Sequence, residues 1–175
     1  MADGSSVSEV NIEVRVGTPG DLDPMMKLAV MAADEAGVRE PDSNLLLQDI
    51  WPALHLDKGI VGIIGAPGAP IEGAVLLRVG TLWYTNEPML EERSTYVHPA
   101  YRHARGGRAS KLCEFSMKAS QTLGMPLTIG VLSNYRTQAK VRMYRRMLGP
   151  PAGAYWLFGI EQTDKHHHPL NGGET

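Results

Sequence analysis

The chain has 175 residues, of which 43% are hydrophobic and 21% charged, a composition typical of one folded domain rather than a disordered chain. No apolar run approaches the roughly 20 residues that span a bilayer, and residues 1–10 lack the apolar stretch of a signal peptide, so we expect a cytoplasmic protein without membrane contact. The single cysteine, Cys113, excludes an internal disulfide and a zinc site built on paired cysteines.

The net charge of −2 conceals a separation of charge along the chain. Residues 101–150 hold ten basic residues and one acid, Glu114, whereas the rest of the chain is acidic. A basic segment of this kind either binds polyanions, such as phosphate groups or nucleic acid, or forms solvated helix faces. The sequence therefore leaves open whether the basic residues converge on one anion or spread over a binding surface.

The predicted elements alternate in type along the chain. We expect a disordered leader over residues 1–10, one folded domain over 11–160 and a mobile tail over 161–175. Hydrophobic periodicity and turn signals predict, in order, a strand over 11–16, a helix over 18–36, a helix capped by Asp42 or Ser43 that reaches residue 54, strands over 59–66, 71–78 and within 89–97, a helix over 107–123, a strand over 127–131, a helix over 136–148 and a strand over 155–160.

The most informative segment runs from residue 96 to residue 109, where a strand ends and a loop rich in Arg and Gly opens directly into a helix. The first-turn amides of a helix have no intrahelical partner and carry the positive end of the helix dipole. Small residues there let phosphate approach the backbone, so we expect a diphosphate at this site. The residues expected to hold the diphosphate-bearing ligand are Tyr96, Val97, Arg102, His103, Ala104, Arg105, Gly106, Gly107, Arg108 and Ala109.

This segment resembles the cofactor loop of the GNAT superfamily of N-acetyltransferases. In that loop, a strand ending in Val-x-Pro leads through an aromatic residue and an Arg to Arg/Gln-x-x-Gly-x-Gly/Ala. The matching residues here are Val97, Pro99, Tyr101, Arg102 and Gly107. Arg105 stands where the first glycine of the pattern falls, and a second register would place the Gly-x-Ala pair at Gly107 and Ala109. We prefer the first register, in which Arg105 adds a charge to the phosphate site.

A second block also resembles the family. Asn134, after the strand at 127–131, corresponds to the residue that contacts the pantetheine arm, although Thr137 stands at the usual spacing from Tyr144 on the next helix. The resemblance implies an α/β (α+β) fold, a GNAT-like single domain whose mixed, mostly antiparallel central sheet is flanked by about four helices. It also implies acetyl-CoA as co-substrate and Tyr144 as the group that returns a proton to the leaving thiolate, a task that suits a neutral phenol.

An acceptor amine must lose a proton before it attacks a thioester, and a carboxylate on the central strand is suited to take it. Glu91 and Glu92 are the candidates, because they lie on the strand that leads into the cofactor loop. Side chains alternate along a strand, so Glu92 shares a side with Ser94 and Tyr96 if the strand is uninterrupted, whereas a bulge would transfer that position to Glu91. We slightly prefer Glu92.

The predicted function is direct N-acetylation of a small-molecule or peptide amine by a monomer or homodimer, with no metal. The acceptor is expected between the first two helices and the loop over 80–88, which carries Trp83 and Tyr84. Four acids weakly favour a cationic acceptor: Asp34, Glu35, Glu40 and Asp42. The alternative is a non-catalytic nucleic-acid or acyl-CoA binding module that uses the basic segment 101–146, with nucleic acid the less favoured partner. Cys113 is predicted to be a buried apolar residue rather than a nucleophile.

Overall fold

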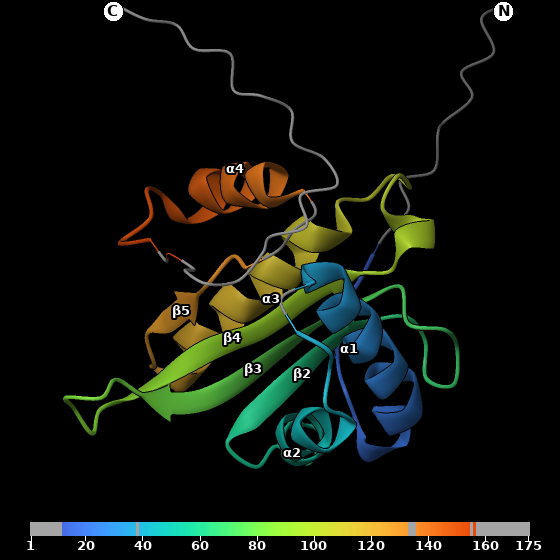
Figure 1. Ribbon diagram of the computed structural model, residues 1–175, viewed down its shortest axis with the longest axis horizontal. Coiled ribbons are helices and arrows are strands. Elements are labelled where there is room, and N and C mark those ends of the chain that lie inside the picture. The colour runs from blue at the N-terminus through green and yellow to red at the C-terminus, as the bar shows by residue number, and fades with distance from the viewer. Residues whose placement is uncertain (1–11, 38, 133–135, 155, 157–175) are drawn as a thin grey trace, which may run out of the picture.

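The computed structural model describes residues 12–37, 39–132, 136–154 and 156, and within these ranges the chain forms a five-stranded sheet (Figure 1). The strands lie side by side in chain order: β1 (Arg15–Val16), β2 (Gly59–Ile64), β3 (Gly73–Thr81), β4 (Pro88–Val97) and β5 (Leu127–Ile129). The first four pair antiparallel, and β5 pairs parallel to β4. The mixed, mostly antiparallel sheet predicted for this chain is confirmed.

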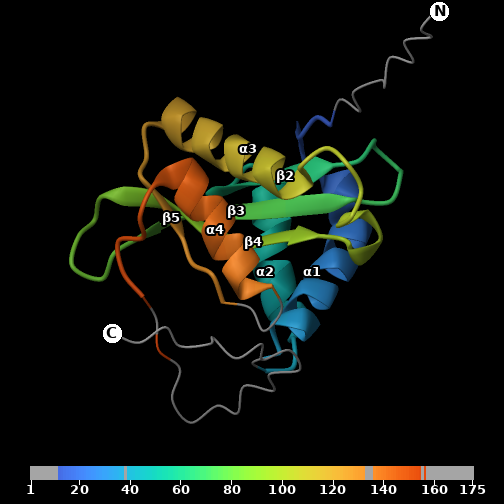
Figure 2. The same ribbon diagram turned by 90° about the horizontal axis from the view of Figure 1, so that it is seen from above.

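Helices cover both faces of this sheet (Figures 1 and 2). The helices of the described ranges are α1 (Leu22–Ala36), α2 (Ser43–Leu54), α3 (Arg108–Leu123) and α4 (Thr137–Leu148), and two short 3-10 turns occupy Pro19–Asp21 and Pro99–Tyr101. One apolar cluster packs α1 and α2 against the sheet through residues such as Leu28, Ile50 and Val61. A second cluster packs α3 against the opposite face through Leu77, Leu90 and Leu112. No helix within the described ranges is long and apolar enough to cross a bilayer.

The helix ends follow the local signals in the sequence. Gly37 and Gly124 end α1 and α3 in the left-handed conformation, with φ of 64° at both positions. Asp42 caps α2, because its side chain accepts a hydrogen bond of 2.8 Å from the amide of Asn44. Pro52 lies inside the last turn of α2, and the helix ends two residues later at Leu54, as predicted.

Several predicted boundaries differ from the structure. The strand expected over 11–16 pairs only at Arg15 and Val16, and the strand expected over 127–131 ends at Ile129 because β5 leaves β4 there. The strand predicted over 155–160, the leader over 1–10, the tail over 161–175 and Asn134 lie outside the described residues.

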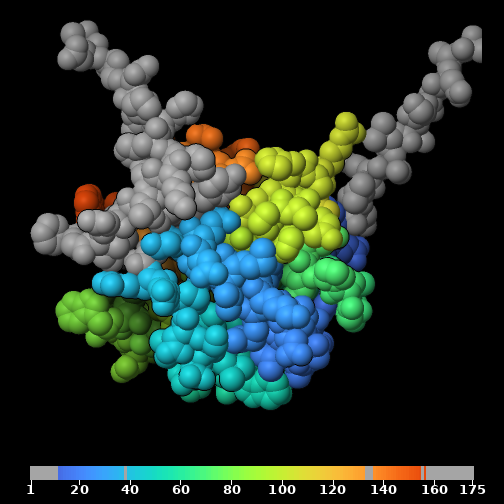
Figure 3. All heavy atoms as spheres, turned by 45° about the vertical axis from the view of Figure 1, so that its right-hand side comes forward, coloured from blue at the N-terminus to red at the C-terminus, as the bar shows by residue number. Residues whose placement is uncertain are grey.

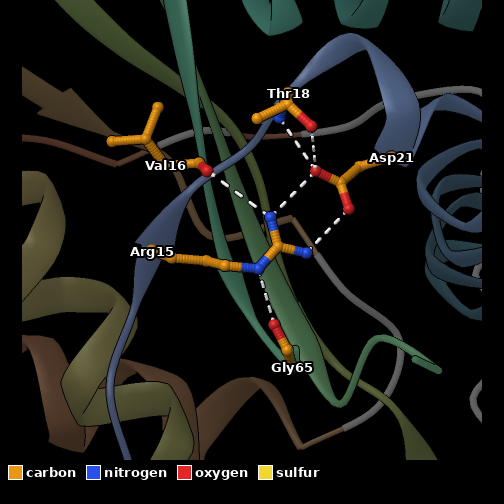
Figure 4. A network of polar contacts seen from close by, with 5 residues as sticks. All are labelled: Arg15, Val16, Thr18, Asp21 and Gly65. Atoms are coloured by element: carbon orange, nitrogen blue, oxygen red, sulfur yellow. Dashed lines mark hydrogen bonds and ion pairs between the residues drawn. The ribbon is translucent and has the colours of Figure 1, made fainter. Parts of the chain in front are cut away.

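A charged network ties β1 to the start of α1 and to the turn between β2 and β3 (Figure 4). The Arg15 guanidinium donates to both carboxylate oxygens of Asp21, at 2.8 and 2.7 Å, and its Nε donates to the carbonyl of Gly65 at 2.6 Å. Asp21 also accepts from the amide and the hydroxyl of Thr18. These donors hold the pKa of Asp21 far below its usual range, with the Arg15 hydrogen bonds as the largest cause.

We expect Asp21→Asn to lower the free energy of unfolding by about 2 kcal/mol at neutral pH, because it removes the charge that Arg15 and Thr18 bind. Because the pKa is lower in the folded state, this stabilisation is present above the pKa of the unfolded chain and is lost as the pH falls. The difference in the free energy of unfolding between wild type and variant should therefore become smaller below about pH 4. Urea unfolding at several pH values measures this difference, with the exposed Asp34→Asn on α1 as control. A difference that does not change with pH would contradict the assignment.

Candidate active site

A β-bulge in β4 decides which way its glutamates face. Leu76 of β3 lies opposite Ser94, but Leu77 lies opposite Glu92, so Arg93 is the extra residue. The bulge puts Glu92 and Thr95 on the α3 side of the sheet, where Leu77 packs, and puts Glu91 on the side of Ser94 and Tyr96. Of the two alternatives left open by the sequence, the structure has the bulge, so the side of Tyr96 belongs to Glu91.

The sheet opens immediately beyond this bulge. β5 pairs with β4 only at three positions, the last being Ile129 opposite Glu92. Two cavities adjoin the opening: an α1 cavity of about 340 Å³ between α1, α2 and the sheet, and a loop cavity of about 240 Å³ between the loop after β4 and the helices α3 and α4. Four residues line both cavities: Glu35, Thr95, Tyr96 and Lys140. Two ligands bound in the two cavities would therefore meet at this opening.

The loop cavity is built around the start of α3. Its wall includes Gly107 and Ala109, so the first-turn amides of α3 lie at this cavity. Gly106 and Gly107 adopt positive φ, 116° and 60°, and a Cβ on Gly106 would lie 2.1 Å from a methyl of Ile12. Arg105 does not adopt a left-handed backbone conformation, so the two glycines after it make the turn. The exposed loop residues are His103, Ala104, Arg105, Gly106 and Gly107.

Arg102 is held by an acid from the N-terminal part of the chain. Its Nη2 donates to Glu35 of α1 at 2.5 Å, and its Nε donates to the carbonyl of Val97 at 2.9 Å. The Tyr96 hydroxyl donates to the same Glu35 oxygen at 2.9 Å, and burial together with Glu35 raises the pKa of Tyr96 to about 12. These contacts fasten the loop to α1, which lies beside it on the surface (Figure 3).

Arg108 is fastened in the same manner on the other side of the loop. Its Nε and Nη2 lie 2.7 Å from Glu72, and its Nη1 donates to the carbonyl of Arg105 at 3.0 Å. The three arginines of the loop therefore have different surroundings. Arg102 and Arg108 are bound to carboxylates, whereas Arg105 is exposed at the surface. The sequence analysis missed Glu35 and Glu72 as partners, because both are distant along the chain. Nucleic-acid binding by the basic segment stays a prediction.

Glu92 and Tyr144 form a direct hydrogen bond, in which the tyrosine hydroxyl of α4 donates to Oε1 at 2.8 Å. Burial raises the pKa of Glu92, and the Tyr144 hydrogen bond only partly opposes this. Burial and the nearby carboxylate raise the pKa of Tyr144, so its phenol is neutral at physiological pH. Oε2 of Glu92 and Oγ1 of Thr95 are both buried, without a hydrogen-bond partner among the described residues. The sequence predicted both members of the pair but not their contact.

Glu91 has different surroundings. Its carboxylate forms an ion pair of 3.1 Å with Arg93 and lies against Gly80, where an added Cβ would be 2.7 Å from Oε1. Arg93 also reaches Asp49 of α2 at 3.5 Å. Glu91 lines neither cavity. Both glutamates are half-buried, but the carboxylate of Glu92 lines a cavity and binds a neutral hydroxyl, whereas that of Glu91 is held in an ion pair.

Lys140 is a site residue that the sequence analysis missed. It lies one helical turn before Tyr144, a spacing of four that places both on one face of α4 and would have been enough to find it. Burial lowers the pKa of its ammonium group.

Two further predictions concern residues near the site. Cys113 is fully buried, and burial raises the pKa of its thiol to about 11, as expected for an apolar role. Trp83 and Tyr84, expected to contact the acceptor, are 95% and 68% exposed at the β3–β4 turn, and neither lines the two cavities.

No family model matches the sequence, and no curated protein matches it by sequence comparison. Solved structures match it well in three dimensions. A predicted acetyltransferase from Clostridium acetobutylicum, solved with acetyl-CoA, has a TM-score of 0.66 and 13% identity over 90% of this chain and 100% of its own. AAC(6')-Iy, solved with the bisubstrate analogue CoA-S-monomethyl-acetylneamine, has a TM-score of 0.64 and 15% identity over 85% of this chain and 97% of its own.

A third similar structure is the aminoglycoside antibiotic 6'-N-acetyltransferase AAC(6')-Ih from Acinetobacter baumannii, with a TM-score of 0.61 and 11% identity over 85% of this chain and 97% of its own. The chain has the GNAT fold. Its order of helices and strands is the one that the resemblance implied for residues 12–148, and the opening between β4 and β5 lies beside the loop that carried the resemblance. At these identities the likeness establishes the GNAT fold alone, and the roles of individual residues rest on the geometry above.

We expect Tyr144→Phe to raise the pKa of Glu92, because the variant removes the hydroxyl that stabilises the charged carboxylate and keeps the ring in place. A pH titration of the carboxyl carbons in glutamate-labelled protein, followed by NMR, measures this shift. The exposed Tyr84→Phe is the control and should leave the Glu92 curve unchanged. The same Glu92 midpoint in Tyr144→Phe and wild type would show that the two groups do not interact in solution.

Proposed function

We propose that the chain is an acetyl-CoA-dependent N-acetyltransferase that passes an acetyl group directly to an amine. The observation that carries this proposal is the Tyr144–Glu92 hydrogen bond, which joins a half-buried phenol to a half-buried carboxylate that lines the α1 cavity of a GNAT fold. The loop cavity is the proposed acetyl-CoA site, and the α1 cavity is the proposed acceptor site. Two of the similar structures were solved with acetyl-CoA or a CoA analogue, which supports this choice of acyl donor.

The first-turn amides of α3 would hold the diphosphate of acetyl-CoA. Gly107, Ala109 and Ser110 line the loop cavity, and the helix dipole favours an anion there. Arg105 supplies an exposed positive charge at the same end of the helix. Arg102 and Arg108 act indirectly, since their ion pairs with Glu35 and Glu72 hold the loop in place around the amides.

Glu92 is the proposed base and Tyr144 the proposed acid. Burial raises the pKa of Glu92 above that of an ordinary carboxyl, which makes its carboxylate a better acceptor for a proton from an amine. An acceptor that arrives as an ammonium ion first loses its extra proton to solvent. The neutral amine nitrogen then bonds to the acetyl carbonyl carbon, Glu92 takes a proton from that nitrogen, and the bond from the carbon to sulfur breaks. Tyr144, neutral because of its raised pKa, gives its proton to the thiolate as it leaves.

The contact between the two groups completes the proton balance. After transfer, Glu92 carries the proton taken from the amine, and Tyr144 lacks the one given to sulfur. Their oxygens are 2.8 Å apart, so the proton can pass from Glu92 to Tyr144 without solvent. The net result is that a proton of the attacking amine ends on coenzyme A, and both side chains return to their starting states.

We expect Arg105→Glu to weaken acetyl-CoA binding at least tenfold, or about 1.4 kcal/mol, because it replaces an attractive charge with a repulsive one at the diphosphate. Binding by the wild type should also weaken as salt is added. Calorimetric titration measures both effects. Lys118→Glu makes the same charge change at an exposed position further along α3 and should bind normally. Equal affinity for all three proteins would remove the loop from the proposed cofactor site.

The proposed chemistry predicts losses of about 10²-fold in kcat for both Glu92→Gln and Tyr144→Phe, with acetyl-CoA affinity unchanged. Thiol release from acetyl-CoA across a pH range measures activity, and the rise of kcat/KM through the ionisation of Glu92 should disappear in Glu92→Gln. Glu91→Gln is the matched control, because its carboxylate is paired with Arg93 instead. Full activity of Glu92→Gln would mean that water removes the proton from the amine.

A further inference from the structure

The walls of the α1 cavity indicate what kind of amine it accepts. We infer that the acceptor is a compact primary amine carried on an apolar aryl or alkyl body, and not a polycationic amino sugar. This inference rests on the proposed function, because it assigns the acceptor of that same site.

Small apolar side chains form one side of the cavity. Ala29, Ala32, Ala33 and Ala36 follow one face of α1 at helical spacing, and all four line the cavity. Ala74 of β3 also lines it. Short side chains leave room for a ligand between α1 and the sheet, and their methyl groups offer no hydrogen bonds to it.

Larger apolar residues make up nearly half of the remaining lining residues. Met25, Leu28, Ile50 and Leu76 line the cavity and are each 5% exposed or less, so they form a fixed apolar surface. A hydroxyl or ammonium group placed against this surface would lose its hydration without gaining a partner, which costs free energy. An aryl or alkyl group placed there would gain free energy by leaving water.

The carboxylates that line the cavity are already engaged. Glu35 binds Arg102 at 2.5 Å, and Asp49 lies 3.7 Å from Arg78 and 3.5 Å from Arg93. Two cationic side chains, Arg93 and Lys140, also line the cavity. The described wall therefore does not offer the excess of negative charge that would bind a ligand with several ammonium groups.

Glu92 differs from these carboxylates because the partner that binds it is a neutral hydroxyl, that of Tyr144. It lines the cavity at the opening between β4 and β5, together with Thr95 and Gly130. An amine with a single amino group can point that group at Glu92 and lay its apolar part along α1. The volume of about 340 Å³ is near the lower end of small-molecule sites, which fits a compact ligand.

The test compares acceptors under the thiol-release assay with saturating acetyl-CoA. The panel contains 2-phenylethylamine and hexylamine as apolar amines, and neamine and spermidine as polycations. We expect kcat/KM to be at least tenfold higher for the apolar pair. Higher kcat/KM for neamine or spermidine would overturn the inference and leave the proposed acetyl transfer intact.

A cavity-filling variant locates the acceptor. Ala32→Leu adds bulk to the α1 wall and should lower kcat/KM for 2-phenylethylamine at least tenfold, while the smaller propylamine loses less than threefold and acetyl-CoA binds as in wild type. Val30→Leu, on the same helix but outside the cavity lining, is the control and should behave as wild type. Equal losses for the large and small amines, or no loss, would overturn the placement of the acceptor.

A binding measurement separates this inference from the proposed function. If acetyl-CoA is bound but no amine releases thiol, the proposed catalysis fails. Calorimetry of 2-phenylethylamine with the protein saturated in coenzyme A still decides the inference: binding that weakens at least tenfold in Ala32→Leu supports it. Absence of binding to wild type, or tighter binding of neamine, overturns it.

Discussion

The early end of the pairing between β4 and β5 is the constraint on which the site depends. If the two strands stayed paired beyond Glu92 and Ile129, the sheet would be closed where the two cavities now adjoin. The bulge at Arg93 acts at the same point, because it rotates Glu92 toward the side on which α4 can reach it. Tyr144 of α4 therefore contacts Glu92 at the point where β4 and β5 separate.

The basic segment 101–150 and the acidic remainder of the chain, which are separate in the sequence, form ion pairs with each other in the structure. The basic segment that follows β4 receives Glu35 from α1 and Glu72 from the turn before β3, so two of its arginines are bound to acids of the acidic part of the chain. Such ion pairs are half-buried and organised by hydrogen bonds, and they therefore fix geometry more than they add net stability. In the proposed function, the exposed Arg105 and the backbone amides of α3 are the groups that face an incoming anion.

Local signals predicted most of the fold. Glycines at 37 and 124, the Asp42 cap and the apolar periodicity of α1 and α3 act within a few residues of the ends they determine, so sequence reasoning found them. The bulge depends on the register of β4 against β3, which counting along one strand does not reveal. Glu35 was missed as the partner of Arg102 for the same reason, since that contact joins residues distant in sequence, whereas Lys140 could have been found from its spacing to Tyr144. The loop at Trp83 was assigned to the acceptor on residue type alone; Trp83 lines neither cavity, and its contact with an acceptor stays a prediction.

Glu35 is at once part of the wall of the α1 cavity, part of the wall of the loop cavity and the anchor of the loop between Val97 and α3. The two sites are consequently not independent modules. Under the proposed function, a change of acceptor preference achieved at the position of Glu35 would also loosen the loop around Arg102, whereas Ala29, Ala32, Ala33 and Ala36 line only the α1 cavity. Changes that suit new amines without disturbing the loop are therefore confined to these alanines and exclude Glu35.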